Sequence, residues 1–339
     1  MMRLLLTLLA VPALAAQDPN FDVQSRLVLV PVTIRDAKGQ PIDGLEASDF
    51  VLLDHGRRQK IAVDTIGTGV APIALVIAVQ SSGISTPVLD KVRKISSMVQ
   101  PLLTGARGCA ALVSFSEHVK WLSECTPDAN ALDQAFAALT PGQAKAARML
   151  DAASQAIDRL RQRKARRVLL LISESRDRGS ETGLDTLMLA AQSAGVTIYA
   201  ATYSAFTTAF TQKTSQPSPR RRGPATPNVI PGDPSYVPLE GRADILGGFA
   251  ELIRLSQVNT TKVLTEQTGG TTFSFTRQKG LEDAIEKLGG ELHTQYLLGF
   301  TPESTVPGYH PIEVRVTGHG DLRIRSRPGY WVAAAKTTQ

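Results

Sequence analysis

The segment IALVIAV at residues 73–79 is a continuous run of apolar side chains with the length of one strand. Because no polar residue interrupts it, we expect a parallel strand that helices cover on both faces. Helical spacing follows at 88–102, 149–160 and 186–194, and strand composition at 167–172, 196–200 and 271–275. This alternation predicts an α/β fold with a doubly wound, mostly parallel sheet over residues 69–275.

Strand-forming segments flank this domain on both sides. The N-terminal part, residues 17–68, contains the run LVLVPVTIR at 27–35. The C-terminal part, residues 276–339, begins with a predicted helix and continues with strands that end in the alternating segments 312–316 and 322–326. Alternation of apolar with basic residues leaves one face of such strands in water. We expect the two flanking β segments to pack together as a small β-sandwich.

Residues 1–16, MMRLLLTLLAVPALAA, combine a charged start at Arg3, a short apolar run and small residues at the end. This pattern predicts a cleaved signal peptide and an exported protein, periplasmic or extracellular. The run is too short to cross ~30 Å of hydrocarbon, and no other stretch approaches the ~20 apolar residues needed. We therefore expect no transmembrane segment after cleavage; a buried cytosolic helix is the alternative.

Charge gives little indication of a partner. The formal net charge is +6, and removal of Arg3 with the signal peptide leaves 36 − 31 = +5. A modest basic balance with 5% aromatic residues does not favour nucleic acid as a partner. The basic residues are spread along the chain except at Arg220, Arg221 and Arg222, which lie in a segment rich in Pro, Ser and Gly. That composition predicts a flexible insertion at 206–239.

The chain has two cysteines, Cys109 and Cys125, each in a segment of strand composition beside the turn 116–118. In an antiparallel hairpin centred on Glu117, the two residues lie directly opposite each other. This position favours a cross-strand disulfide in an oxidising compartment. Two buried free thiols are the alternative.

Five segments together resemble bacterial VWFA-related domain proteins. They are LVLVPVTIRDAKGQPIDGLEASDFVLLDHG at 27–56, ISESRDRGS at 172–180, HTQYLLGFTPE at 293–303, YHPIEVRV at 309–316 and LRIRSRPGYW at 322–331. The resemblance covers nearly the whole mature chain. It implies a von Willebrand factor type A-like fold, a role in protein binding or adhesion, and a metal-ion-dependent adhesion site beyond the carboxyl ends of the strands.

The resemblance also assigns the positions of that adhesion site, which needs two Asp, two Ser and a Thr as oxygen ligands for Mg²⁺. The positions fall on Gln80, Ser82, Ile84, Ala147 and Glu174. Ser82 matches the pattern and Glu174 retains a carboxylate, but a neutral amide, an Ile and an Ala offer little to a cation that loses its water. We predict a degenerate site with no tightly bound metal and no cofactor.

Alternatives remain open for this rim. Weak Mg²⁺ binding through Gln80, Ser82, Ser85 and Glu174 is one, and a shifted alignment that uses Ser81 or Ser85 restores a hydroxyl. The serines can equally cap the following helix. Arg176 and Arg178 can extend a binding surface, or they can be solvated loop charges.

Sequence motifs do not favour an enzyme. The histidines at 55, 118, 293, 310 and 319 are scattered without a pair at metal spacing, and no nucleophile elbow or Walker sequence occurs. We expect a metal-independent protein-binding or adhesion and scaffold module that uses the loop rim to bind a protein or a cell-envelope ligand. A structural or assembly protein of the envelope is the alternative, in which the arginines at 220–222 contact anionic lipid or wall polymer.

Overall fold

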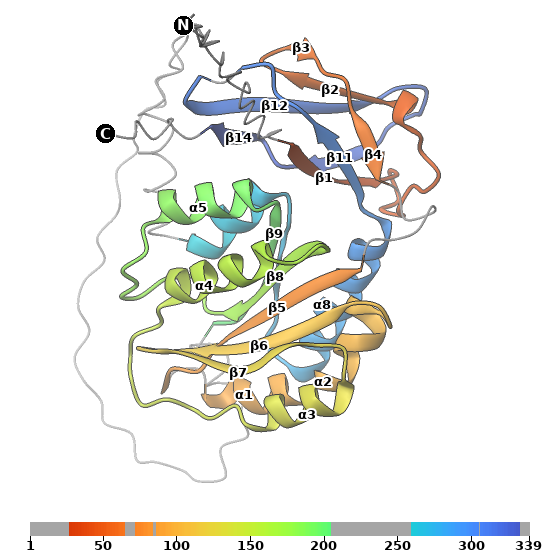
Figure 1. Cartoon of the computed structure of the whole chain (residues 1–339). Coiled ribbons are helices and arrows are strands. Elements are labelled where there is room, and N and C mark those ends of the chain that lie inside the picture. The colour runs from red at the N-terminus through yellow and green to blue at the C-terminus, as the bar shows by residue number, and fades with distance from the viewer. Residues whose placement is uncertain (1–26, 65–71, 84–85, 205–258, 305, 333–339) are drawn as a thin grey trace, which may run out of the picture.

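The computed structural model describes residues 27–64, 72–83, 86–204, 259–304 and 306–332. An α/β domain forms the lower part of the molecule in Figure 1, and a β-rich part lies above it. The predicted signal peptide, the predicted insertion at 206–239 with its three arginines, and Ile84 and Ser85 lie outside the described residues. None of the helices in the described ranges combines the length and the apolar character needed to cross a membrane.

The central sheet has the strand order β10-β9-β8-β5-β6-β7. Its strands are β5 (Ile73–Gln80), β6 (Cys109–Phe115), β7 (Val119–Thr126), β8 (Arg166–Ser173), β9 (Val196–Thr202) and β10 (Thr272–Ser274). All neighbours are parallel except β7, which runs antiparallel to β6. Every side chain of β5 is buried, as its uninterrupted apolar run predicts. The predicted doubly wound fold class is confirmed.

Helices cover both faces of this sheet (Figure 1). One face carries α1 (Thr86–Arg93), α2 (Ser96–Met98), the π-helical segment Val99–Thr104, α3 (Ala129–Ala137) and α8 (Gln278–Thr294). The other carries α4 (Met149–Arg161), α5 (Leu184–Ser193) and the helical residues 259–268. The helix expected at 88–102 is divided in the structure into three short segments, and α3 was not expected.

Two four-stranded antiparallel sheets form the β-rich part. One has the order β13-β1-β11-β4 and the other β14-β12-β2-β3. Their strands are β1 (Val28–Arg35), β2 (Phe50–Asp54), β3 (Arg57–Arg58), β4 (Ala62–Asp64), β11 (Tyr296–Phe300), β12 (Gly308–Val316), β13 (Arg323–Ser326) and β14 (Gly329–Val332), with a 3₁₀ turn at Ala47–Asp49. A single hydrophobic cluster contains side chains of both sheets. The two ends of the chain therefore form one sandwich, as expected.

A polar cluster joins this sandwich to the central domain. Arg325 of β13 donates to Thr33 Oγ1 of β1 at 3.0 Å and to Gly270 O, ahead of β10, at 2.9 Å. The same guanidinium forms an ion pair with the buried carboxylate of Glu291 in α8. Gln295 Nε2 donates to Thr33 Oγ1 at 3.1 Å. Buried charge-assisted hydrogen bonds have defined directions, so these contacts orient the two parts relative to each other.

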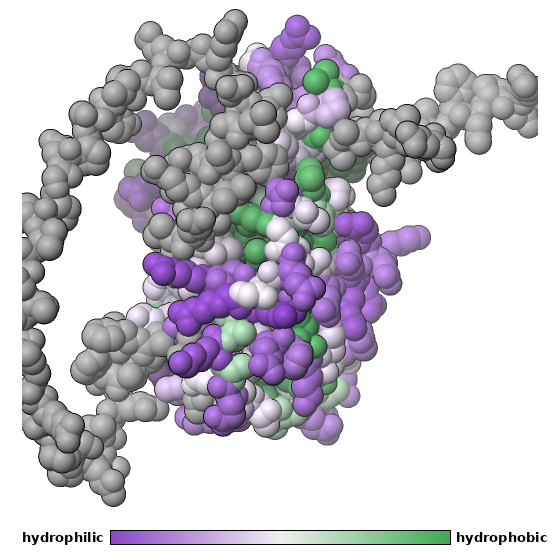
Figure 2. Space-filling view, turned by 90° about the vertical axis from the view of Figure 1, so that its left-hand side faces the viewer, coloured by the Kyte–Doolittle hydropathy of each residue, from purple (hydrophilic) through white to green (hydrophobic). Residues whose placement is uncertain are grey.

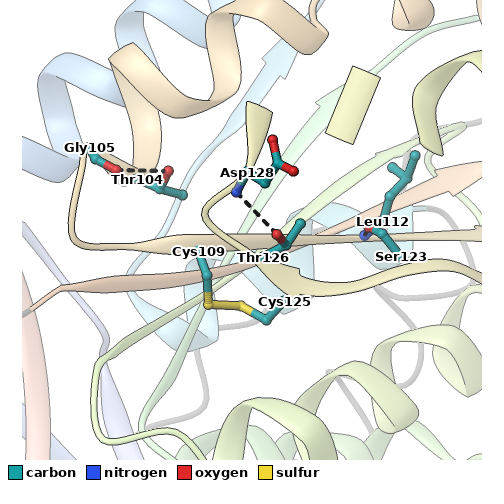
Figure 3. The surroundings of a disulfide bond; sticks show 8 residues. All are labelled: Thr104, Gly105, Cys109, Leu112, Ser123, Cys125, Thr126 and Asp128. Atoms are coloured by element: carbon teal, nitrogen blue, oxygen red, sulfur yellow. Dashed lines mark hydrogen bonds between the residues drawn. A yellow bond between two sulfur atoms is a disulfide. The ribbon is translucent and has the colours of Figure 1, made fainter. Parts of the chain in front are cut away.

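The disulfide Cys109–Cys125 links β6 to β7, with the two Cα atoms 5.2 Å apart (Figure 3). The expected register is wrong in detail. Near the turn Phe115 pairs with Val119, as a hairpin centred on Glu117 requires, but two irregularities shift the pairing so that Ala110 faces Thr126. Extra residues in one strand of a pair produce such shifts. Cys125 is therefore displaced along β7 from the position directly opposite Cys109.

Candidate functional site

The strand end of β5 places three polar residues below the loop rim of the central domain. Gln80, Ser81 and Ser82 are all buried, and Gln80 is only 1% exposed. Gln80 Nε2 donates to Ser82 Oγ at 2.8 Å, and Gln80 Oε1 accepts from the backbone N–H of Glu174 at 2.9 Å. The Gln80 amide thus connects its own strand end to the loop that follows β8. Ser81 instead bonds to β6, where Ser81 N donates to Phe115 O at 2.8 Å.

The loop after β8 is also held by Ala147. Ala147 and Arg178 exchange two backbone hydrogen bonds of 2.9 Å each, and Ala147 is buried. The Glu174 carboxylate lies 3.3 Å from the Arg178 guanidinium. Arg176, two residues earlier, is exposed. The structure therefore brings Gln80, Ser82 and Glu174 together, and Ala147 is fixed to the same loop through Arg178.

These contacts do not fit a divalent cation held by the assigned positions. The amide group of Gln80 points a hydrogen-bond donor at Ser82 Oγ, the hydroxyl that best matches the ligand pattern. The one carboxylate among the described positions, that of Glu174, is paired with Arg178. Hard cations require several oxygen ligands with compensating negative charge. In this arrangement the Gln80 amide connects the end of β5 to the loop after β8 through two hydrogen bonds.

A polar pocket of about 560 Å³ opens on the same rim, lined by the turn 117–119, the start of α4 and residues 181–186. Arg148 lies in this pocket between two carboxylates, 3.0 Å from Glu181 and 3.7 Å from Asp151. The carboxyl ends of the parallel strands point to the left in Figure 1. That side faces the viewer in Figure 2, where hydrophilic residues predominate over the described part of the central domain.

Asp151 organises this pocket. Partial burial by itself raises the pKa of the Asp151 carboxyl, but hydrogen bonds from Thr182 and Glu181 and the charge of Arg148 outweigh it and lower the pKa. The backbone N–H groups of Thr182 and Glu181 donate to Asp151 Oδ1 at 2.8 and 3.1 Å. A carboxylate that accepts several amide bonds is favoured in its charged form. Asp151 therefore stays ionised and fixes the loop between β8 and α5.

The first amides of α4 are not available to an anionic partner. Leu150 N donates to Asp177 Oδ1 at 3.0 Å, and Asp151 N donates to Ser180 Oγ at 3.2 Å. Side chains at these positions satisfy the N–H groups that lack partners within a helix. The amides of Leu150 and Asp151 are therefore already satisfied by side chains of the protein itself. Sequence reasoning missed Arg148, Asp151 and Glu181, although charges around a predicted helix start are a visible signal.

Two of the five histidines are not scattered. The ring centroids of His55 and His310 lie 4.9 Å apart, and Asp54 is adjacent to both. The sequence shows no histidine pair at metal spacing, but the fold brings these two histidines close together in space. The two residues are far apart in sequence, and the pairing of β2 with β12 brings them together.

No family model and no curated protein matches the chain. Solved structures do match. The vWF domain of the type V pili tip protein Mfa5 from Porphyromonas gingivalis is 19% identical, over 32% of this chain and 40% of that structure, with a TM-score of 0.28. The conserved hypothetical protein BatB from Bacteroides thetaiotaomicron is 14% identical, over 65% of this chain and 98% of that one, with a TM-score of 0.41.

A third match is an aerotolerance-related membrane protein from Bacteroides fragilis, 12% identical over 65% of this chain and 99% of that one, with a TM-score of 0.40. The strand order and the fully buried β5 give the central domain a doubly wound α/β fold, and similarities this distant add no argument about its family or role. The chain spans less than half of the Mfa5 structure, so nothing about the activity of that protein transfers with the fold.

Proposed function

We propose that this protein is a binding module that recognises another protein through the rim of its von Willebrand factor A-like domain, without a resident metal ion. The Gln80 amide carries the proposal. It is buried, and it bonds at once to Ser82 and to the backbone of Glu174. The loops that form the rim are thereby held in place by hydrogen bonds of the chain itself.

The pocket beside these residues favours a polar partner surface. Arg148, Asp151 and Glu181 offer both signs of charge, and side chains already cap the start of α4. Recognition would then depend on side-chain hydrogen bonds and ion pairs at an open surface, which fix orientation and partner choice. The sequence contains no nucleophile elbow and no nucleotide-binding loop, which is compatible with a binding role. The proposal does not include an enzymatic activity of the rim.

We also propose that the protein is exported. The Cys109–Cys125 disulfide supports an oxidising compartment, since cytosolic thiols are generally kept reduced.

The metal-independent part is tested by calorimetric titration of Mg²⁺ and Mn²⁺ into the mature protein. The positive control is a variant with Gln80→Asp, Ile84→Ser and Ala147→Thr, which restores the ligand pattern. Ala147 is only 1% exposed. A second variant carries only Gln80→Asp and Ile84→Ser, and it serves as the positive control if Ala147→Thr disturbs folding. We expect no binding below the millimolar range in the wild type and binding in the restored variants. Tight binding of either ion by the wild type contradicts the proposal.

The binding part is tested with a photo-crosslinking amino acid at Glu181 in the rim, compared with the same amino acid at Glu313. Glu313 is a matched control because it is also exposed and ion-paired but lies on β12 of the sandwich. We expect a crosslinked protein adduct from the rim position, equal in amount with and without EDTA. Equal crosslinking from both positions, or loss of the rim adduct in EDTA, contradicts the proposal.

A further inference from the structure

Two inward-facing rows of the sandwich end in groups that bind metals. In β2 the buried positions are Phe50, Leu52 and Asp54, and in β12 they include His310, Ile312 and Val314. Side chains two apart on a strand share a face. The Asp54 carboxylate therefore continues the apolar row of β2, and the His310 imidazole continues that of β12. Asp54 is 5% exposed and His310 is 4% exposed. Polar groups this deeply buried need partners.

Asp54, His55 and His310 bring their ligand atoms together. One such atom from each residue lies within 4.8 Å of those of the other two. His55 Nδ1 lies 2.9 Å from Asp54 Oδ1, and the two imidazole rings meet edge to face at 84°.

The buried ring of His310 has an unused nitrogen. His310 Nε2 lies 2.8 Å from Val306 O, and a carbonyl oxygen only accepts, so Nε2 carries the hydrogen. In the neutral ring Nδ1 then bears a lone pair. This atom is buried and has no hydrogen-bond partner among the described residues. A histidine that donates one N–H to a backbone carbonyl and offers the other nitrogen has the orientation typical of a metal ligand.

The neighbouring groups fix the other two ligands. Asp54 Oδ2 accepts from Tyr330 Oη at 2.8 Å, and the ring of Tyr330 stacks on that of His310 with the centroids 5.0 Å apart. His55 has a φ of 47° and Gly56 one of 76°, so the chain turns tightly from β2 into β3. His55 N donates to Pro311 O at 3.2 Å, which ties this turn to β12.

We propose that Asp54, His55 and His310 form a binding site for one divalent first-row transition-metal ion, with Zn²⁺ as the best-suited probe. Two imidazoles and a carboxylate favour such ions over Mg²⁺, which takes oxygen ligands. The ligand atoms all lie within 4.8 Å of one another, so small side-chain movements can place each of them at about 2.0–2.2 Å from one Zn²⁺. His55 can move inward because its side chain is 51% exposed. Its open side leaves a further coordination position for water.

The experiment uses the full mature chain with its disulfide intact. Zn²⁺ affinity is measured by competition with a chelator, and the thermal midpoint is recorded with and without Zn²⁺. His55→Asn removes one ligand, and Asn tolerates the left-handed conformation at this turn. His310→Phe removes the buried nitrogen and keeps a ring against Tyr330. His319→Asn is the matched control, because His319 is an exposed histidine of the same sandwich.

We expect the wild type and His319→Asn to bind one Zn²⁺ and to gain thermal stability from it, since an ion that binds only the folded state stabilises that state. His55→Asn and His310→Phe should each bind Zn²⁺ roughly tenfold or more weakly and lose most of the thermal gain. The proposal is overturned if the wild type shows no saturable binding below the millimolar range, or if His55→Asn binds as the wild type does. If His310→Phe does not fold, His55→Asn alone decides between these outcomes.

Discussion

Reduction of the Cys109–Cys125 disulfide should destabilise the central domain by about 3 kcal/mol. The two cysteines are 16 residues apart, and on the chain-entropy model the closure of a loop of this size removes entropy from the unfolded chain and raises its free energy by about that amount. The sheet edge itself should persist, because β6 and β7 remain paired through backbone hydrogen bonds over most of their length. The disulfide therefore acts mainly on the unfolded state.

The measurement is equilibrium unfolding in urea, followed by tryptophan fluorescence, with and without dithiothreitol. Trp121 reports on this hairpin because it lies on β7, where its indole N–H donates to Gln155 Oε1 at 3.1 Å and the Arg159 guanidinium lies 3.6 Å above its ring. With a slope of about 3 kcal/mol per molar urea, the expected loss moves the midpoint down by about 1 M.

A variant with both cysteines replaced by alanine is the control. It should unfold near the midpoint of the reduced wild type and should not respond to dithiothreitol. Coincident unfolding curves for the oxidised and reduced wild type would refute the reasoning, since they would mean that the hairpin already restrains the unfolded chain or that the oxidised form is strained by the same amount.

Two further predictions concern charged groups. Arg325→Met should destabilise the protein in urea by about 2 kcal/mol or more, because it leaves the buried Glu291 carboxylate without the Arg325 guanidinium. The control Arg315→Met breaks an exposed ion pair and should lower the free energy of unfolding by less than about 1 kcal/mol. Equal losses in the two variants would contradict this reasoning. Asp151→Asn should lower the thermal midpoint near neutral pH, and the difference from the wild type should shrink below pH 3.8, because a carboxyl with a lowered folded-state pKa stabilises only where it is ionised. A difference that does not change with pH would argue against it.

The sequence predicts the fold class well because its signals are local. The uninterrupted apolar run of β5 indicates a strand with two covered faces, and the helical spacing of α4 indicates a crossover. The register of β6 with β7 was less accessible, since the irregularities between Ala110 and Val113 follow from packing and not from turn length. The break between α1 and the π-helical segment was likewise hidden within a continuous apolar spacing.

The sequence predicts the position of the candidate site only as far as it predicts which strands are neighbours in the sheet. Gln80 ends β5 and Glu174 follows β8, and the carboxyl ends of these neighbouring parallel strands meet at one edge of the sheet. The hydrogen bonds of the Gln80 amide depend on side-chain rotamers that no spacing determines. The pairing of His55 with His310 depends on the contact between β2 and β12, although the alternation of β2 does continue from Phe50 and Leu52 to Asp54.

The sandwich built from both ends of the chain has a consequence for the order of folding during synthesis. Leu45 and Tyr296, which share a hydrogen bond across the sandwich, are 251 residues apart. A ribosome releases the N-terminal segment first, so β1 and β2 emerge long before β11, β12 and β13, which pair with them, and their apolar side chains and strand edges are open to solvent until then. The central domain lies between these segments in the sequence, and its folding brings them near each other. The sandwich is therefore completed only after β14 has been synthesised, because β14 pairs with β12.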